Sequence, residues 1–222
     1  MRRLVHPINL VMSKPRYRRI LLKLSGEAFG KQGQGLDEQL LKNIVNEIQS
    51  LYRTGVKIAI VVGGGNWWRK RDGTVSITSN TSDYLGMIGT AMNALALHDA
   101  LTAADVPVNL QSFVVTVPGV SAVSAARARA SLTKGRVVIF GGGTGRPGVT
   151  TDTAAAQRAV DINADLIVKA GNVDGVYSAD PRNNSRAKKY IHLKFSQAIK
   201  QNLGVMDVGA YKICQKHKIS VV

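Results

Sequence analysis

The sequence predicts an α/β protein, a three-layer αβα sandwich with a mainly parallel central sheet. Three observations lead to this fold class: short β-rich runs alternate with longer windows of helical periodicity, several runs are apolar on both faces, and glycine clusters stand at the joints. Strands that are apolar on both faces must be covered on both sides, as in a parallel sheet between helical layers. The length of 222 residues suits one domain with a sizeable core.

The first elements justify this reading in order. A strand is expected at residues 20–24, ended by Ser25-Gly26. Apolar residues recur at three-and-four spacing over residues 37–53, which predicts a helix closed by Gly55. Ser82 or Asp83 can cap a long helix to about Ala104. Its buried side is expected to hold Leu85, Ile88, Met92, Leu95 and Leu101. The other expected elements are strands at 56–62, 108–117, 137–140 and 166–168 and helices at 121–132 and from Thr151-Asp152 to about Ile162.

The composition narrows the class of partner. Lysine and arginine number 30 against 14 acidic residues, giving a formal charge of +16 and predicting an anionic partner such as phosphates, nucleic acid or a membrane surface. The single cysteine, Cys214, excludes an internal disulfide and indicates a reducing, cytoplasmic setting. The longest apolar stretches, such as residues 58–62, are too short to span a membrane, and no membrane partner is expected.

The first 18 residues are expected to form a basic tail outside the fold. Six of the 30 basic residues lie within positions 1–19, which contain no acidic residue. Met12-Ser13-Lys14-Pro15 resembles a natural start. Residues 19–222 are therefore expected to form the domain proper.

Three glycine-rich turns follow strands of the expected sheet. They are Lys23-Leu24-Ser25-Gly26, Gly63-Gly64-Gly65-Asn66 with Arg69 beyond, and Gly141-Gly142-Gly143-Thr144-Gly145 followed by Thr150-Thr151-Asp152. In an open α/β sheet, ligands collect at the carboxyl ends of the strands. Consecutive glycines let the backbone approach a phosphate, and lysine and arginine supply the charge that phosphates need. The three turns together predict a phosphate site.

Simpler readings of single motifs stay open from the sequence. The Gly63-Gly64-Gly65 turn can be a plain strand-to-helix turn, Lys23 a solvated lysine, and Asp152 only a helix cap. No P-loop motif occurs. Gly143-Thr144-Gly145-Arg146-Pro147-Gly148 matches the dinucleotide-binding pattern after a strand, but its proline stands where the following helix should already be forming.

A family resemblance rests on seven segments taken together, in chain order. The segments are Arg19-Ile20-Leu21-Leu22-Lys23-Leu24-Ser25-Gly26-Glu27-Ala28, Val62-Gly63-Gly64-Gly65-Asn66, Asp83-Tyr84-Leu85-Gly86-Met87, Gly143-Thr144-Gly145, Thr150-Thr151-Asp152, Val173-Asp174-Gly175-Val176-Tyr177-Ser178-Ala179-Asp180-Pro181 and Val205-Met206-Asp207. In this order they resemble the bacterial uridylate kinases, which have the amino acid kinase fold. The resemblance implies transfer of the γ-phosphoryl of ATP, with Mg²⁺, to UMP in pyrimidine nucleotide biosynthesis.

The resemblance also implies site residues. Lys23, Arg69 and Asp152 would be catalytic, and no protein residue is expected as a metal ligand. ATP would contact Lys23, Leu24, Ser25, Gly26, Gly65, Arg69, Gly171, Asn172, Tyr177 and Asp180. UMP would contact Gly64, Asp83, Thr144, Gly145, Arg146, Pro147, Gly148, Val149, Thr150 and Thr151. For Asp180-Pro181 the residues alone equally suggest a turn.

Two departures from the family pattern affect the expected identity of the acceptor substrate. Arg146 stands where the family often has a small polar residue against uracil, and Gly148-Val149 replaces a common aromatic pair. A kinase of the same fold with another acceptor is therefore an alternative. A degenerate kinase fold that binds nucleic acid is a second alternative, motivated by the charge, although only 5% of residues are aromatic.

Assembly, regulation and chain length follow from the same resemblance. The family implies a homohexamer with contacts through the long helix after Asp83, activation by GTP and inhibition by UTP. The segment at 30–37 corresponds to a loop linked with activation, without the usual aromatic-glycine pattern. Family members continue with a further strand and a hairpin, so the chain is expected to be cut inside its last strand at 218–222.

Overall fold

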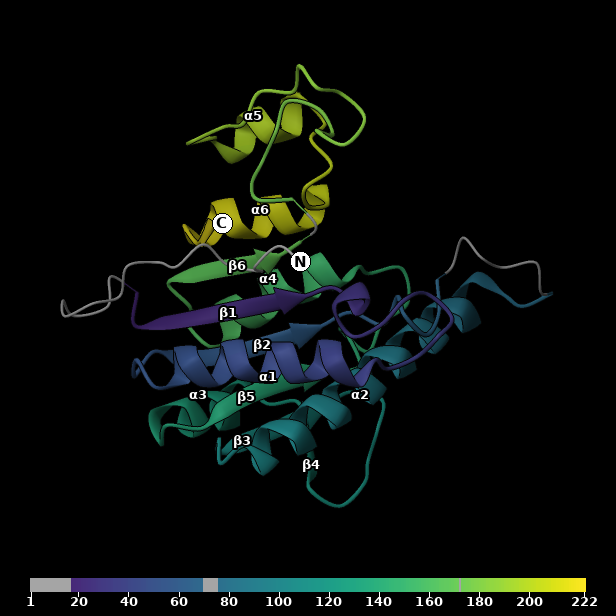
Figure 1. The fold of residues 1–222 in the computed structure, drawn as a ribbon, viewed down its shortest axis with the longest axis vertical. Coiled ribbons are helices and arrows are strands. Elements are labelled where there is room, and N and C mark those ends of the chain that lie inside the picture. Colours follow the sequence, from purple (N-terminus) through teal and green to yellow (C-terminus); the bar gives the residue numbers. More distant parts are fainter. Residues whose placement is uncertain (1–16, 70–75, 172) are drawn as a thin grey trace.

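The computed structural model describes residues 17–69, 76–171 and 173–222 as a seven-stranded sheet between helices (Figure 1). The spatial strand order is β4-β3-β5-β2-β1-β6-β7, and every neighbouring pair is parallel. The strands are β1 (Arg19–Leu24), β2 (Lys57–Val62), β3 (Val108–Ser112), β4 (Val120–Ala122), β5 (Val137–Gly141), β6 (Leu166–Ala170) and β7 (Ser220–Val221). The helices are η1 (Gly26–Ala28), α1 (Glu38–Tyr52), α2 (Ser79–Ala103), α3 (Ala125–Thr133), α4 (Thr151–Asp161), α5 (Phe195–Lys200) and α6 (Val208–His217). The parallel sheet expected from the sequence is confirmed.

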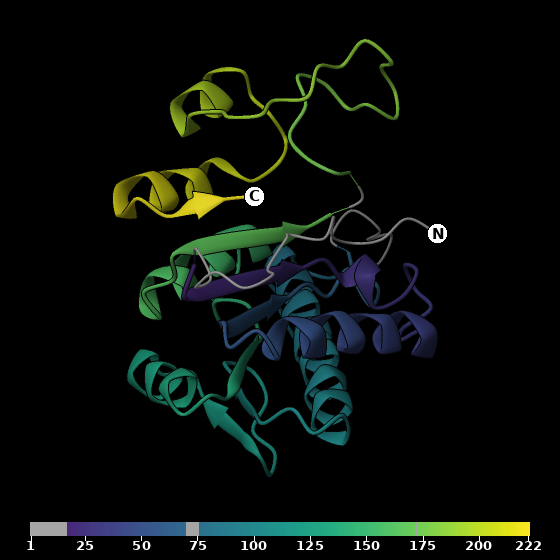
Figure 2. The same ribbon diagram turned by 60° about the vertical axis from the view of Figure 1, so that its left-hand side comes forward.

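Two cores, one on each face of the sheet, show the three layers directly. Alternate residues of β2 divide between them, because successive strand side chains point to opposite faces. Ile58 and Ile60 pack with α1 and α2, whereas Ala59 and Val61 pack with α3, α4 and α6. Figure 2 shows the segment after β6, with α5 and α6, on the side of the sheet where β7 is the edge strand.

Several elements match their expected positions, and their ends have local causes. Asp37 caps α1 by accepting from Leu40 N at 3.0 Å, and Gly55 follows the helix with φ of 81°. Such a left-handed conformation favours glycine. The last strand expected near 218–222 is β7. Of the expected basic tail, residues 1–16 lie outside the described residues.

The expected helix at 121–132 was wrong in its first turn. Residues Val120–Ala122 form β4, which pairs with β3, and the helix begins only after Ser124. The Ser124 side chain accepts from Arg127 N at 3.4 Å, and the Ser124 N–H donates to Gln111 Oε1 at 2.8 Å. Both contacts fix Ser124 in extended backbone, so the helix cannot continue upstream. The strand expected at 108–117 likewise ends at Ser112.

Helix α2 begins earlier than expected and buries a different face. Its cap is Thr78, which accepts from Thr81 N at 3.2 Å. Of the five residues expected on the buried side, only Leu101 is buried, while Ile88 and Met92 are 44% and 38% exposed. The helix is apolar around most of its circumference, so periodicity could not fix its orientation. Small residues set the orientation of α2: Gly86 and Gly89 let the helix approach Gly64 after β2, and Ala91 and Ala94 lie against Gly141 at the end of β5.

Candidate active site

The glycine turns after β1 and β2 touch one another at the carboxyl edge of the sheet. The two strands are in register, with Leu24 opposite Val62. A Cβ added to Gly26 would lie 2.2 Å from Gly65 N, and one added to Gly64 would lie 2.6 Å from Gly86 O. Neither position has room for a side chain. The glycines are therefore needed to bring β1, β2 and α2 together.

A buried cluster of two lysines and one aspartate lies at the same edge. Lys23 Nζ is 3.0 Å from Asp152 Oδ1, and Lys169 Nζ is 2.8 Å from Asp152 Oδ2. The three side chains are only 11%, 15% and 20% exposed, for Lys23, Asp152 and Lys169 respectively. Lys169 also donates to the carbonyl of Val205. The sequence-based alternative of a solvated Lys23 was wrong.

The cluster depends on β1, β6 and α4. Lys23 and Lys169 are register partners on neighbouring parallel strands. Asp152 lies in the first turn of α4, and Thr150 caps that helix by accepting from Thr153 N at 3.1 Å. The plain helix-cap reading of Asp152 was therefore wrong, because Thr150 has that role and leaves the Asp152 carboxylate to the lysines.

Burial lowers the pKa of the Lys23 ammonium below its ordinary value of 10.5. Desolvation is the largest cause, the nearby Lys169 charge acts in the same direction, and Asp152 opposes both. The site thus holds two ammonium groups close together in a poorly solvated place. Such an arrangement favours the arrival of a multiply charged anion.

Arg69 and Glu27 lie beside the glycine turns. The Arg69 Nε donates to Gly65 O at 3.2 Å, and the guanidinium forms a close ion pair with Glu27. The arginine predicted from the sequence is therefore held against the turn after β2. Residues 70–75, which follow Arg69, lie outside the described residues.

The loop from Thr144 to Thr151 connects β5 to α4 and is fixed at two places. Gly148 N donates to Asp83 Oδ2 at 2.7 Å, joining the loop to α2. Thr150 donates to Asp207, which also accepts from Thr153 Oγ1 at 2.8 Å and from Ala210 N at 2.9 Å. Asp83 thus lies on α2 beyond its first turn rather than at its cap. Asp83 and the loop residues predicted for the acceptor therefore lie together between α2 and α4, whereas Gly64 lies against α2 at Gly86.

The residues predicted for adenosine lie in the segment after β6. Tyr177 OH donates to Asp174 Oδ1 at 2.7 Å, and Asp180 pairs with Arg182 at 2.7 Å. Arg182 holds the pKa of Asp180 at about 2, first through its side-chain hydrogen bonds. These contacts form a turn, and none of them reaches Lys23. A Cβ on Gly171 would have no neighbour within 4 Å, and Asn172 lies outside the described residues.

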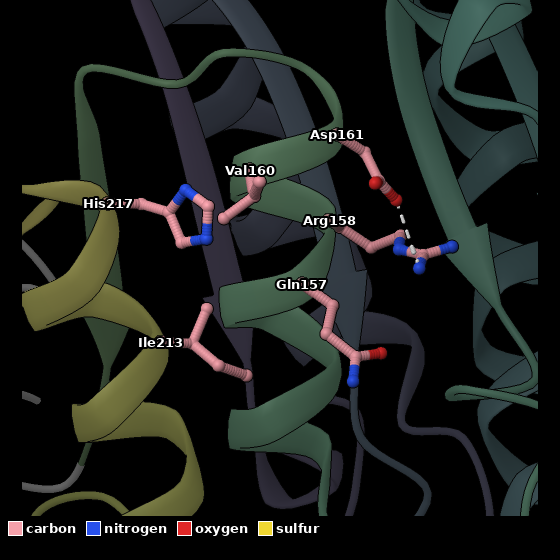
Figure 3. A pocket seen from close by; sticks show the side chains of 6 residues that line it. All are labelled: Gln157, Arg158, Val160, Asp161, Ile213 and His217. Carbon is pink, nitrogen blue, oxygen red and sulfur yellow. Dashed lines mark ion pairs between the residues drawn. The ribbon is translucent and has the colours of Figure 1, made fainter.

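A separate hollow of about 350 Å³ lies between α4 and α6. Figure 3 shows Arg158 and Asp161 of α4 turned away from Ile213 and His217 of α6. Arg158 pairs with Asp161 at 3.0 Å and lies over the ring of Phe113 at 5.3 Å. None of the residues predicted for either substrate lines this hollow.

Comparison with known proteins identifies the family. The model of the amino acid kinase family matches residues 18–222. A uridylate kinase from Coxiella burnetii is 45% identical over 93% of this chain and 86% of its own length. A uridylate kinase from Methylococcus capsulatus is 45% identical over 94% and 88%. The chain belongs to the amino acid kinase family, among the uridylate kinases. The solved UMP kinase from Bacillus anthracis superposes with a TM-score of 0.88 at 36% identity, covering 92% of this chain and 86% of that one.

Within the cluster of Lys23, Asp152 and Lys169, the residue that the sequence did not predict is Lys169. The strand expected there ended at residue 168, so Lys169 had no assignment, although it takes the same position in β6 as Lys23 in β1, one residue before the strand ends. A lysine within an otherwise apolar run was the available signal. Glu27, Asn93 and Asp207 were also not chosen as site residues, because their roles depend on contacts between distant segments.

Proposed function

We propose that this chain transfers the γ-phosphoryl group of ATP to UMP, giving UDP and ADP, in pyrimidine nucleotide biosynthesis. The observation that carries the proposal is the buried cluster of Lys23, Asp152 and Lys169 at the edge where the glycine turns meet. The substrates are inferred from two relatives that are named uridylate kinases and are 45% identical to this chain.

The proposed reaction needs alignment and charge neutralisation more than proton transfer. An oxygen of the UMP phosphate forms a bond to the γ-phosphorus as the bond to the β,γ-bridging oxygen breaks, and ADP leaves with that oxygen. The acceptor is already an anion, so no general base is required. Lys23 and Lys169 provide positive charge for the transferring group, Asp152 sets their positions, and Arg69 lies against the glycine turn between the two phosphate sites.

The two nucleotides are assigned to opposite sides of this cluster. We place the ATP phosphates over Leu24, Ser25, Gly26 and Gly65 and the adenosine near Gly171, Asn172, Tyr177 and Asp180. UMP would lie against Gly64, Asp83 and the loop from Thr144 to Thr151. The Gly148–Asp83 contact supports this placement, because it brings the loop and the start of α2 to one side of the turns.

Mg²⁺ is proposed to arrive with ATP, held by its phosphate oxygens. Each Asp152 oxygen already lies within 3.0 Å of a lysine nitrogen. Among the described residues, no group of three or more His, Cys, Asp or Glu side chains forms a metal cluster. The residues therefore do not fit a metal cage made by the protein, and no residue is assigned as a ligand.

An acceptor panel tests the proposed activity. We expect ADP release with UMP to exceed release with CMP, AMP, carbamate or acetylglutamate, measured by a coupled assay against a reaction without acceptor. Arg146 is exposed in the acceptor loop, and this observation favours a different acceptor as the second candidate. Absence of turnover with UMP would contradict the proposal, and turnover with another acceptor would support the second candidate. Salt-dependent retention of RNA without any turnover would instead support nucleic-acid binding.

We further propose a cytoplasmic homohexamer, activated by GTP and inhibited by UTP, whose subunits meet through α2. Tyr84, Ile88 and Met92 recur every four residues on this helix and are 45%, 44% and 38% exposed. An exposed apolar stripe of this kind is typical of an interface. Sedimentation velocity should show a multiple of the 23.8 kDa chain, and Ile88→Glu should reduce it. A wild-type protein sedimenting as one chain would contradict the assembly.

Among the helices of the described residues, none has the length and the apolar composition that a membrane span requires.

A further inference from the structure

Two asparagine side chains form a fully buried pair behind the glycine turn after β2. Asn66 follows the turn, Asn93 lies in the middle of α2, and both are 0% exposed. Asn93 Nδ2 donates to Asn66 Oδ1 at 2.8 Å, and Asn66 Nδ2 donates to Asn93 Oδ1 at 3.0 Å. Polar groups buried to this degree are costly unless their hydrogen bonds are complete.

The pair uses all its donors and joins three separate segments. The second Asn93 N–H donates to Gly63 O at 2.7 Å, and the second Asn66 N–H donates to Gly35 O at 2.9 Å. Trp67 Nε1 donates to Asn93 Oδ1 at 2.8 Å. The amides therefore connect α2, the glycine turn and the loop that contains Gly35.

The bond to Gly63 fixes the turn where phosphate is proposed to bind. Gly63 N already donates to Leu24 O at 2.8 Å, so Asn93 engages the other end of the same residue. The N–H groups of Gly64 and Gly65, which come next, donate to no atom of the described residues. With Gly63 held on both sides, these two N–H groups have a defined direction in which to meet an anion.

We propose that Asn66 and Asn93 are positioning residues for phosphoryl transfer, which hold the Gly63-Gly64-Gly65 turn in its binding conformation. This inference rests on the proposed function, because it concerns the phosphate site of that reaction. Neither side chain touches substrate, since both are covered. A small displacement of a binding group reduces the rate strongly, because the reacting atoms must be aligned.

Asn93→Ala tests the inference, with Gln111→Ala as the matched control. Gln111 is also a 0% exposed amide with two hydrogen bonds, from Ser124 N and to Asn109 Oδ1, but it lies on β3 away from the turn. We expect both variants to lose similar thermal stability. Only Asn93→Ala should lose at least ~10-fold in kcat at saturating substrates, by analogy with misaligned binding groups.

Trp67→Phe separates the Gly63 contact from the rest of the network. It removes the indole donor to Asn93 but leaves the Asn93–Gly63 bond, so kcat should stay within about twofold of wild type if the turn contact is what matters. If Asn93→Ala does not fold, Asn93→Ser compared with Gln111→Ser gives the same test. Equal kcat losses in the Asn93 and Gln111 variants, or no loss in either, would overturn the inference. An inactive wild-type protein would instead contradict the proposed function.

Discussion

Lys23→Met is expected to reduce kcat at least ~10²-fold, because one preorganised positive group at a developing charge contributes about that much or more. Lys169→Met is expected to cause a loss of similar size, since Lys169 holds the other oxygen of the same carboxylate. The melting temperature should change little in either variant, because Asp152 keeps one lysine partner. Initial rates at saturating ATP and UMP, together with thermal unfolding, measure both quantities.

The exposed Lys42 on α1 provides the control for these variants. Lys42→Met removes the same charge far from the cluster and should leave kcat unchanged. The double variant Lys23→Met/Lys169→Met should lose much less than the product of the single losses, because groups that act as a unit are not additive. Full activity in either single variant would show that the cluster is structural only.

The central strands β1, β2, β5 and β6 could be predicted from the sequence because each is a short, mainly apolar run. β4, with the sequence Val-Ser-Ala, has no such run and fell inside an expected helix. In the structure, Ile58 and Ile60 lie in one core and Ala59 lies in the other, as expected for a strand that is apolar on both faces. By contrast, the predicted buried face of α2 was wrong, because the prediction assumed that the large apolar residues mark the buried face of a helix. Here the glycine turn requires small residues against it, and Ile88 and Met92 face outward.

The site was predictable where a single segment carries the signal, and not where two segments combine. Lys23 and Asp152 belong to motifs that could be recognised locally. The role of Lys169 requires knowing that β6 lies beside β1, although more than 100 residues separate them in the chain. Asn93 resembles an ordinary surface residue in a helix until the turn it contacts is placed beside it. No strand or helix was expected between β6 and β7, since the periodicity of α5 and α6 is too short to detect.

Asp152→Asn is expected to move the alkaline limb of the kcat/KM profile to lower pH. The Asp152 charge raises the pKa of Lys23 against the effect of burial, so removing it lowers that pKa further below 10.5. Lys169→Gln should move the same limb to higher pH, because the Lys169 charge lowers the pKa of Lys23. In the proposed reaction the Lys23 ammonium binds the phosphates, so in the free enzyme this limb reports the pH at which that ammonium loses its proton.

Opposite shifts of the alkaline limb in Asp152→Asn and Lys169→Gln would show that the limb reflects the titration of Lys23 and not a general effect of pH on the fold. Between its lowered pKa and 10.5, Lys23 binds fewer protons in the folded than in the unfolded chain, so its contribution to stability rises with pH. Activity falls through that same window, which means that unfolding linked to Lys23 cannot cause the loss. Asp161→Asn, on the same helix but paired with Arg158, removes an equal charge and should leave the limb in place. Equal shifts for Asp152→Asn and Asp161→Asn would assign the limb to net charge rather than to the lysine cluster.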